Sequence, residues 1–421
     1  MSEGVNVGKT SPTKAKERVV FLDVLRGFAL VGILFANILS WSGIKFLPFN
    51  DIVELGNADV DVKLYQYIKF FVDTKFYTLF SLLFGVGFYL QISKNMDNPD
   101  FPRIYMKRLS ILLFIGICHA LIWSGDILML YALMGMVLLA LRRIPVAKAL
   151  AVGLGFYFLP IFLDIIYMQT FAPELPTLAK TALKVYPDIT PEHVVSAFQS
   201  ENFASVFKIN FHNVLWRWYD FIPSGRPLKV LGLFFLGYYL YSREFFTVHA
   251  KKWKFMISFL LLGFVLTGLT MYLKGSVSSF SKSWADLLDK LIHEVAQLSL
   301  SLGYVCVLSK LVDSFPKFFA FGWLKNYGRM SLTSYLGHTI LGIIVFYPII
   351  AWKLFGKLTL EQVYYLALLI LAVQLVFSNM WFRFFHFGPV EWLWRCATFG
   401  KWFPIRKIEK KNRLAFDGKP I

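Results

Sequence analysis

Long apolar segments recur along this 421-residue chain, and they constrain its fold more than any other feature. A helix needs about 20 mostly apolar residues to cross a bilayer, with a range of about 17–25. The sequence predicts an all-α, polytopic transmembrane helix bundle of about ten spans, some with approximate edges. The predicted spans are 19–42, 76–92, 109–123, 127–141, 149–168, 227–242, 255–273, 295–312, 330–352 and 362–382.

Composition agrees with a chain whose solvent is mostly lipid. Hydrophobic residues make up 57% and charged residues 17%, whereas soluble domains average about 45–50% apolar and about 25% charged. The mean hydropathy is +0.56. The three cysteines form no CxxC pair, and the His-Glu pair at 293–294 lacks the second histidine of a zinc helix, so no metal site is predicted.

The net charge of +18 is distributed unevenly between the two sides of the predicted membrane. With the N-terminus inside, the predicted inner segments carry 28 Lys and Arg residues and the outer segments carry 14. This positive-inside pattern predicts that both termini lie in the cytoplasm. No basic stripe with interleaved aromatics is found on a soluble module, which argues against a nucleic-acid partner.

Three regions follow from this topology. Residues 1–18 form a predicted cytoplasmic tail, 19–400 the transmembrane domain, and 401–421 a basic cytoplasmic tail that we expect against anionic lipid. No cleavage site follows the first helix, so we expect it to remain as a span. The outer segment 169–226 contains Trp-Arg-Trp-Tyr at 216–219, which is either an interfacial aromatic belt or a substrate cap.

The first helix carries a polar stripe. Asp23 and Arg26 are three residues apart and can pair on one face. Asn37 follows Arg26 by eleven residues, which returns it to nearly the same face about 16 Å further along the helix. The stripe is interpreted either as a structural Asp–Arg pair near the interface or as an anion-binding arginine at the mouth of a cavity.

A second cluster of polar residues lies where the third and fourth spans are joined. His119 lies near the outer end of one span, Gly125 and Asp126 form a tight turn, and Tyr131 follows one helical turn later. The turn predicts that His119 and Asp126 lie close together on the outer side. A histidine beside a carboxylate can act as an oriented base, but it can equally be a packed, hydrogen-bonded side chain.

A third cluster of polar residues lies in and beside the ninth span. Arg329 stands at its predicted cytoplasmic start, and His338 lies nine residues further on. The polar residues between them either join helices or line a pocket. Glu391 follows Pro389 in an amphipathic, Trp-rich segment that we expect in the inner interface. Four further histidines are predicted in loops or at the interface: His193, His212, His249 and His293.

At these polar clusters the sequence resembles a bacterial family, the YeiB-like membrane proteins. Together the stretches span almost the whole chain, and they imply a multi-pass protein of the bacterial inner membrane. They read L-D-V-L-R-G-F-A-L-V-G-I-L-F-A-N at 22–37, F-Y-T-L-F-S-L-L-F-G-V-G at 76–87, G-D-I-L-M-L-Y-A-L at 125–133, Y-G-R-M-S-L-T-S-Y-L at 327–336 and G-P-V-E-W-L-W-R at 388–395.

The first helix is also distantly similar to that of transmembrane acyltransferases, including the type 3 proteins and heparan-α-glucosaminide N-acetyltransferase. Arg26 matches the arginine of the type 3 proteins, but Asn37 stands where they have a catalytic histidine. The heparan enzyme resembles this chain in having Asn there, and takes its histidine from the following outer loop. Loop 43–75 contains no histidine here, so His119 with Asp126 is the candidate base.

The resemblance implies an acyl group moving from a cytoplasmic donor such as acyl-CoA to a hydroxyl or amine of a small-molecule, lipid or glycan acceptor outside. Asn37 would orient the reactants near His119. Arg26, Arg329 and Asp23 would hold the donor, with bidentate contacts from the arginines to its phosphates. Further pocket candidates are Tyr131, His338 and Glu391.

Two other functional classes remain open. Buried polar groups and intramembrane histidines are equally common in a transporter or exporter of a small solute or lipid-like molecule. An inverted repeat would favour that class, but none is visible in the sequence. A structural or sensory membrane protein is the third interpretation. The bilayer is the expected partner in every case, and an oligomer is compatible with all three.

Overall fold

The computed structural model describes residues 20–95, 98–170, 190–200, 202–273, 283–348 and 353–407. The predicted tail 1–18 lies outside these residues, as do most of the basic tail 401–421 and part of the outer segment 169–226. The described residues are helical, and apart from one isolated bridge between Phe385 and Arg406 they contain no β-structure. The predicted all-α class is confirmed.

Every predicted span corresponds to a helix. These helices are α1 (Val20–Trp41), α4 (Lys75–Ile92), α5 (Phe101–Ile122), α6 (Leu128–Ala140), α7 (Val146–Thr170), α11 (Arg226–Ser242), α12 (Trp253–Leu273), α13 (Trp284–Ser314), α15 (Ser331–Phe346) and α16 (Leu360–Phe384). The shorter elements between them are η2 (Ile44–Phe46), α2 (Phe49–Glu54), α3 (Ala58–Phe71), α9 (Pro191–Gln199), α10 (Phe203–Ser224), η3 (His249–Lys251), α14 (Phe319–Arg329) and α17 (Pro389–Phe399).

Seven segments in the described part of the chain are long and apolar enough to cross a membrane. Helices α6 and α15 are apolar but shorter, and α11 has 17 residues with two cations near its start. The protein is therefore a membrane protein of the helical-bundle class. The count of ten spans stays a prediction.

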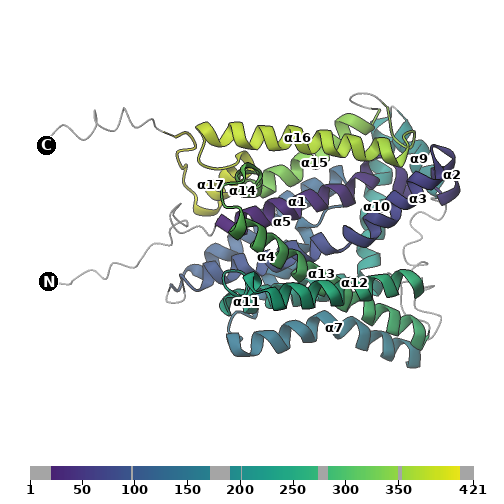
Figure 1. Cartoon of the computed structure of the whole chain (residues 1–421). Coiled ribbons are helices and arrows are strands. Elements are labelled where there is room, and N and C mark those ends of the chain that lie inside the picture. The colour runs from purple at the N-terminus through teal and green to yellow at the C-terminus, as the bar shows by residue number, and fades with distance from the viewer. Residues whose placement is uncertain are drawn as a thin grey trace, which may run out of the picture.

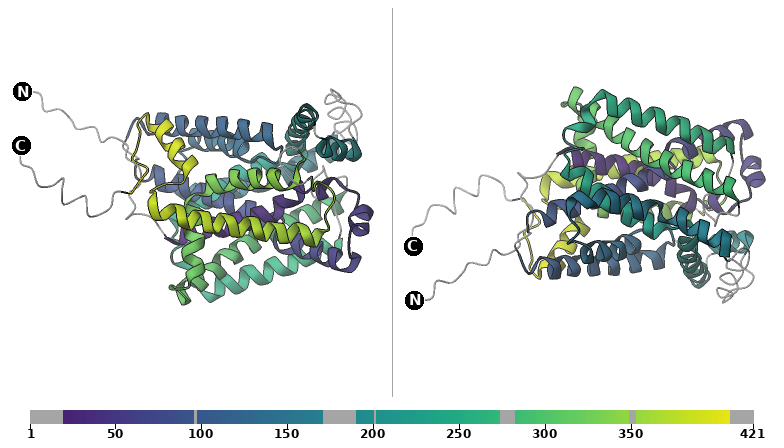
Figure 2. Two further views of the ribbon diagram at one scale, coloured as in Figure 1. Left: turned by 90° about the horizontal axis from the view of Figure 1, so that it is seen from above. Right: turned by 90° about the horizontal axis from the view of Figure 1, so that it is seen from below.

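The two ends of the bundle differ in structure (Figure 1). Helices α14 and α17 lie at the end where α1 begins, whereas α2, α3 and α9 lie at the opposite end. Helices α7, α11, α12 and α13 form one side of the bundle, and α1, α15 and α16 form the other, as Figure 2 also shows. This polarity separates the predicted cytoplasmic elements from the predicted outer ones.

Two helix crossings bring backbones into direct contact at glycines. A β-carbon placed on Gly85 of α4 would lie 1.9 Å from the carbonyl oxygen of Phe234 in α11, and one on Gly237 would lie 2.0 Å from that of Leu82. Helices α1 and α14 approach in the same way at Gly328, 2.0 Å from the Asp23 oxygen. Small residues permit such approach between membrane helices, where packing rather than hydrophobicity drives association.

Several predicted segments differ from the structure. Helix α5 begins at Phe101 rather than at 109, and α15 ends at Phe346 rather than at 352. Segment 43–75, expected as an outer loop, contains helices α2 and α3, and the Asn57 side chain accepts the amides of Asp59 and Val60 at the start of α3. The span predicted at 295–312 begins at Trp284, because Ser283 and Asp286 form a reciprocal capping box there. A capped start extends the helix beyond the apolar run.

The histidine assignments change with these boundaries. His293 lies well inside α13 rather than in a loop. His193 belongs to the capping box of α9, and His212 lies within α10. His249 lies in the short helix η3. Helices α2, α3, α9 and α10 were not predicted, because polar residues interrupt them and none contains the run of about 20 apolar residues that marks a span.

We expect Gly85→Val to destabilise the protein by about 1–3 kcal/mol or more, because the added side chain meets a backbone carbonyl that cannot move aside. Thermal unfolding of purified protein, followed by size-exclusion chromatography, measures the effect. Gly87→Val on the same helix is the control, since a β-carbon at Gly87 meets nothing within 4 Å. Equal melting temperatures for the two variants would contradict the crossing described above.

Candidate functional site

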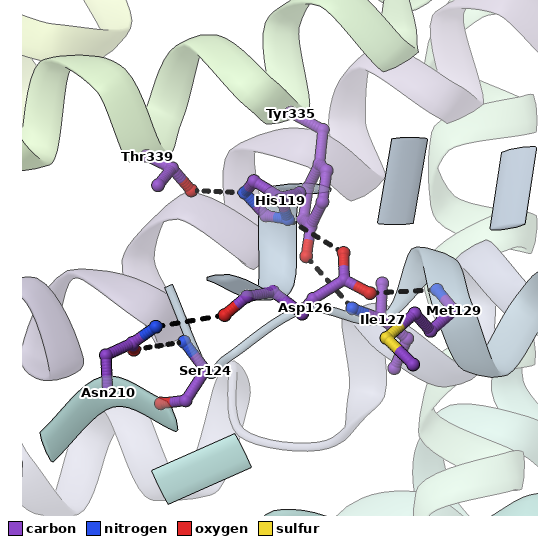
Figure 3. Close-up of polar contacts among 9 residues, drawn as sticks. His119, Ser124, Asp126, Ile127, Met129, Asn210, Tyr335 and Thr339 are labelled. Carbon is purple, nitrogen blue, oxygen red and sulfur yellow. Dashed lines mark hydrogen bonds and ion pairs between the residues drawn. The ribbon is translucent and has the colours of Figure 1, made fainter. Parts of the chain in front are cut away.

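The outer end of α5 places a histidine against a carboxylate. His119 lies in the last turn of α5, and Asp126 lies in the turn before α6. The His119 Nδ1 atom is 2.7 Å from Asp126 Oδ1 (Figure 3). The predicted proximity of the two residues is present in the structure. Their catalytic role stays a prediction.

A threonine from a distant helix completes a three-residue chain. Thr339 of α15 places its hydroxyl oxygen 2.9 Å from His119 Nε2. Asp126 Oδ2 accepts the Met129 amide at 2.8 Å, so the carboxylate is an acceptor through both oxygens. Nδ1 therefore carries the hydrogen, and Nε2 accepts from the Thr339 hydroxyl. A hydroxyl, an imidazole and an orienting carboxylate in this order are the elements of an activated nucleophile.

Aromatic rings enclose the imidazole. The ring centres of Tyr335 and Trp123 lie 5.3 Å and 5.7 Å from that of His119. Trp41, at the outer end of α1, packs on Trp123 at 4.8 Å. His119 is only 4% exposed. The imidazole is thus shielded from water.

Asn210 of α10 fixes the turn that carries Asp126. Its amide nitrogen donates to the carbonyls of Ala120 at 3.0 Å and Leu121 at 2.8 Å, while its oxygen accepts the Ser124 amide at 2.8 Å (Figure 3). These groups would otherwise be unpaired at the end of α5. Sequence reasoning missed Asn210, because nothing in the local pattern of the outer segment connects it to a turn 86 residues away.

The aromatic run of α10 has mixed exposure. Trp216 is 46% exposed, as expected for an interfacial belt. Arg217 is partly buried and lies within electrostatic reach of Asp126 and Tyr335. The alternative of a substrate cap stays a prediction.

The polar stripe of α1 runs between the two ends of the bundle. Arg26 donates to Asp23 at 2.7 Å, as the spacing predicts, and Asp23 is 6% exposed. Asn37 is half-buried one helical turn before Trp41, on the same face. Since Trp41 packs on Trp123, this face of α1 leads from the Asp23–Arg26 pair toward the His119 centre.

The predicted donor-binding arginines face different helices. Arg26 lies within electrostatic reach of Tyr241 at the end of α11. Arg329 stacks over Phe382 of α16 at 4.0 Å and donates to the His386 carbonyl at 3.3 Å. Both arginines lie at the predicted cytoplasmic end, where α1 and α14 cross.

Glu391 caps a helix. Its Oε1 accepts the amides of Leu332 and Thr333 at 2.6 Å and 3.1 Å, and its Oε2 accepts the Thr333 hydroxyl at 2.6 Å. The negative charge thus lies at the N-terminus of α15, where the helix dipole favours it. Thr339 lies about two turns further along α15, so Glu391 supports the helix and does not contact the His119 centre.

His338 and Tyr131 belong to separate networks. The Nε2 atom of His338 is 2.6 Å from the Tyr327 hydroxyl, which donates to Gln374 at 2.9 Å. The Tyr131 hydroxyl is 2.6 Å from Ser81 on α4. Both side chains are buried. The structure brings neither into direct contact with His119.

Two buried ion pairs were not anticipated from the sequence. Lys229 of α11 is 2.6 Å from Glu294 of α13, and Lys290 of α13 is 2.7 Å from Asp164 of α7. All four side chains are at most 8% exposed. The sequence signal for the second pair was Asp164, inside the apolar run 149–168. Its partner Lys290 was assigned to a loop, because the span was predicted to begin at 295 whereas α13 begins at Trp284. Within the described residues no His, Cys, Asp and Glu cluster could hold a metal ion.

We expect Asn210→Ala to destabilise the protein by about 1–3 kcal/mol, because it leaves buried backbone groups of Ala120, Leu121 and Ser124 without partners. Hydrogen exchange should accelerate in residues 120–126. Asn213→Ala, one turn along α10, is the control, because the Asn213 amide nitrogen makes no hydrogen bond. Unchanged exchange in both variants would show that α10 does not hold the turn.

Comparisons with known proteins place this chain among relatives of similar length. A family model described as "Protein of unknown function (DUF418)" matches residues 240–401. The protein YxaH of Bacillus subtilis (strain 168) is 30% identical over 422 residues, covering 95% of this chain and 98% of its own. A 39.9 kDa protein from the amylase 3′ region of Bacillus acidopullulyticus is 29% identical, covering 94% and 97% of the two chains.

YeiB of Escherichia coli (strain K12) is 27% identical over 397 residues, covering 91% of this chain and 96% of its own. All three relatives are named as uncharacterized proteins, so their names assign no activity. The resemblance to YeiB-like proteins is confirmed over nearly the whole chain. The chain belongs to the DUF418 family of YeiB-like membrane proteins.

Proposed function

We propose that this protein is a membrane acyltransferase, which moves an acyl group from a cytoplasmic donor such as acyl-CoA to an acceptor hydroxyl or amine on the outer side. The acceptor is a small molecule, a lipid or a glycan, and the protein resides in the bacterial cytoplasmic membrane. His119 is the general base, and Asp126 orients it. The two ends of the bundle hold the two substrates.

The observation that carries this proposal is the chain Thr339–His119–Asp126. A hydroxyl already sits at the proton-accepting nitrogen of His119, at 2.9 Å. This distance is within the reach that a general base needs to its substrate proton, about 2.6–3.2 Å. The acceptor hydroxyl or amine takes the same position when it binds, displacing the Thr339 hydroxyl from Nε2.

The reaction follows from this position. As the acceptor oxygen or nitrogen attacks the acyl carbonyl carbon, its proton passes to His119 Nε2. The carbon–sulfur bond of the thioester breaks, and the coenzyme A thiolate leaves and takes up the proton. Asp126 stabilises the imidazolium through Nδ1, and half-buried Asn37 is near enough along α1 to orient the acyl carbonyl. Exclusion of water by the aromatic rings favours transfer over hydrolysis.

The donor occupies the cytoplasmic end. Arg26 and Arg329 bind its phosphates, and Asp23 holds Arg26 in place through the 2.7 Å pair. From Arg26 to Trp41 the α1 axis rises about 22 Å, which is the distance that the acyl arm of the donor must cover to approach His119.

His119→Ala is expected to lower the rate of acyl transfer by about 10²–10⁴-fold, because proton transfer by a positioned base contributes that much. Thr339→Val should have a smaller effect, since the hydroxyl is displaced by the acceptor. The measurement is transfer of a radiolabelled acetyl group from acetyl-CoA, in membranes that contain the purified protein and an extract of outer-envelope acceptors.

His193→Gln is the control, because His193 is exposed on α9. It should transfer at the wild-type rate. If the wild-type protein neither binds acetyl-CoA nor forms a labelled product, the acyltransferase proposal is wrong. If His119→Ala retains full activity, His119 is not the base.

A transporter is the second candidate, and one observation favours it. The pairs Lys229–Glu294 and Lys290–Asp164 are buried among α7, α11 and α13. Charged residues inside membrane bundles commonly mark proton or ion pathways. In this alternative an unchanged solute or lipid-like molecule crosses the membrane, coupled to protonation of these carboxylates.

Glu294→Gln is expected to destabilise the protein by about 3–5 kcal/mol, because it leaves the Lys229 ammonium buried without its counter-charge. The double variant Lys229→Met with Glu294→Gln should recover most of this loss. Thermal unfolding measures both. Proton flux into proteoliposomes separates the functions: flux in wild-type protein that the stable double variant lacks would favour transport, whereas identical flux in both assigns the ion pairs to stability alone.

A further inference from the structure

Three cations gather on the outer side, close to the His119 centre. Lys45 lies in η2, just after α1, Arg217 lies on α10, and Arg226 begins α11. The guanidinium carbons of Arg217 and Arg226 lie 5.5 Å and 5.8 Å from the centre of one ring, that of buried Phe221. Arg226 also lies 5.3 Å from the Tyr77 ring.

These cations have no close counter-charge. Among the described residues, no carboxylate forms a salt bridge with Lys45, Arg217 or Arg226, whereas Arg26, Lys229, Lys251 and Lys290 each have one. The Nε atom of Arg217 is buried without a hydrogen-bond partner. Burying charges without pairing them costs free energy, so an arrangement of this kind calls for an anion from outside the chain.

The three cations lie close enough to influence one another. The Lys45 side chain is exposed to solvent, and its pKa is lowered to about 8, chiefly by burial and then by the charges of Arg217 and Arg226. Asp73 and Asp220 raise this pKa, but more weakly. The cations therefore repel one another at a place that an anion from solution can reach.

One of the three cations, Arg217, lies near the proposed catalytic centre. Arg217 lies within electrostatic reach of Asp126 and Tyr335. The Tyr335 hydroxyl accepts the Ile127 amide at 3.3 Å, directly after Asp126. An anion held by Arg217 would therefore be close to the turn that carries the carboxylate partner of His119.

We propose that Lys45, Arg217 and Arg226 form an outward-facing binding site for a phosphate group. Two arginines provide planar donor pairs that match phosphate oxygens, and a lysine adds a point charge. The phosphate belongs either to a soluble phosphate ester or to the headgroup of an anionic lipid. That this molecule is the acyl acceptor rests on the proposed function, but the binding itself does not.

The test measures binding without any acyl donor. Full-length protein in phosphatidylcholine nanodiscs is titrated with glycerol 1-phosphate by calorimetry. In parallel, nanodiscs of mixed phosphatidylglycerol and phosphatidylcholine are made, and the lipid retained by the protein is quantified by mass spectrometry. Saturable heat with the soluble ester identifies a soluble ligand, whereas selective retention of phosphatidylglycerol identifies a lipid headgroup.

Arg217→Gln and Arg226→Gln should each weaken phosphate binding at least tenfold. Arg243→Gln is the matched control, because Arg243 caps the opposite end of α11 and stacks on Tyr239 at 5.5 Å. It should change binding less than twofold. Absence of binding to both probes, or equal binding by the Arg217 and Arg243 variants, would overturn the inference.

The site should also respond to pH through Lys45. Because its pKa is about 8, wild-type affinity should fall as the pH rises from 7 to 9 and Lys45 loses its charge. Lys45→Gln, on a solvent-accessible side chain, should remove this dependence and so tests the site even if the arginine variants do not fold. A pH dependence that persists in Lys45→Gln would exclude Lys45 from the site.

Different outcomes contradict the anion site and the acyltransferase. Phosphate binding that survives His119→Ala, in a protein without acyl transfer, would support the anion site and contradict the acyltransferase. Acyl transfer that is unaffected by Arg217→Gln, in a protein that binds no phosphate, would support the acyltransferase and contradict the anion site.

Discussion

The organisation of this protein depends on one constraint: a polar group buried in a membrane bundle must find its partner within the protein. The His119 centre meets this constraint through side chains from three helices and one turn. Asp126 accepts both the His119 Nδ1 hydrogen and the Met129 amide, Thr339 occupies the other ring nitrogen, and Asn210 pairs the open end of α5. The contacts of Asp126 are local, whereas those of Thr339 and Asn210 join elements that are far apart in the chain.

A catalytic histidine and a merely packed one both obey this constraint, so the identity of their partners must distinguish them. A packed histidine needs partners for its two nitrogens, and His119 has them. What distinguishes this centre is the order of the partners, with a carboxylate at Nδ1 and a hydroxyl at Nε2, together with unneutralised cations nearby. The Tyr327–His338–Gln374 network also buries a histidine, but it has no carboxylate and no cation cluster beside it.

The polarity of the bundle gives the proposals their direction. The Asp23–Arg26 pair lies in the first turns of α1, and Arg329 ends α14, which crosses α1 there. His119 lies in the last turn of α5, next to the outer end of α1 through the Trp41–Trp123 contact, and Lys45 follows that end of α1. A protein that faces both compartments can transfer a group across the membrane or move a solute through it. The ion pairs of α7, α11 and α13 provide the physical basis for the second activity, and the Thr339–His119–Asp126 chain for the first.

The sequence by itself determined the helical membrane class, a helix at each predicted span, the Asp23–Arg26 pair and the proximity of His119 to Asp126. These features depend on apolar runs and on spacings of a few residues, so local rules suffice. Only the tertiary structure brought Thr339 to His119 and Asn210 to the turn that carries Asp126, paired Lys229 with Glu294, and made a helix of the segment before 295. Such contacts depend on how helices cross at glycines such as Gly85 and Gly328, and no local pattern encodes which distant backbone will lie against them.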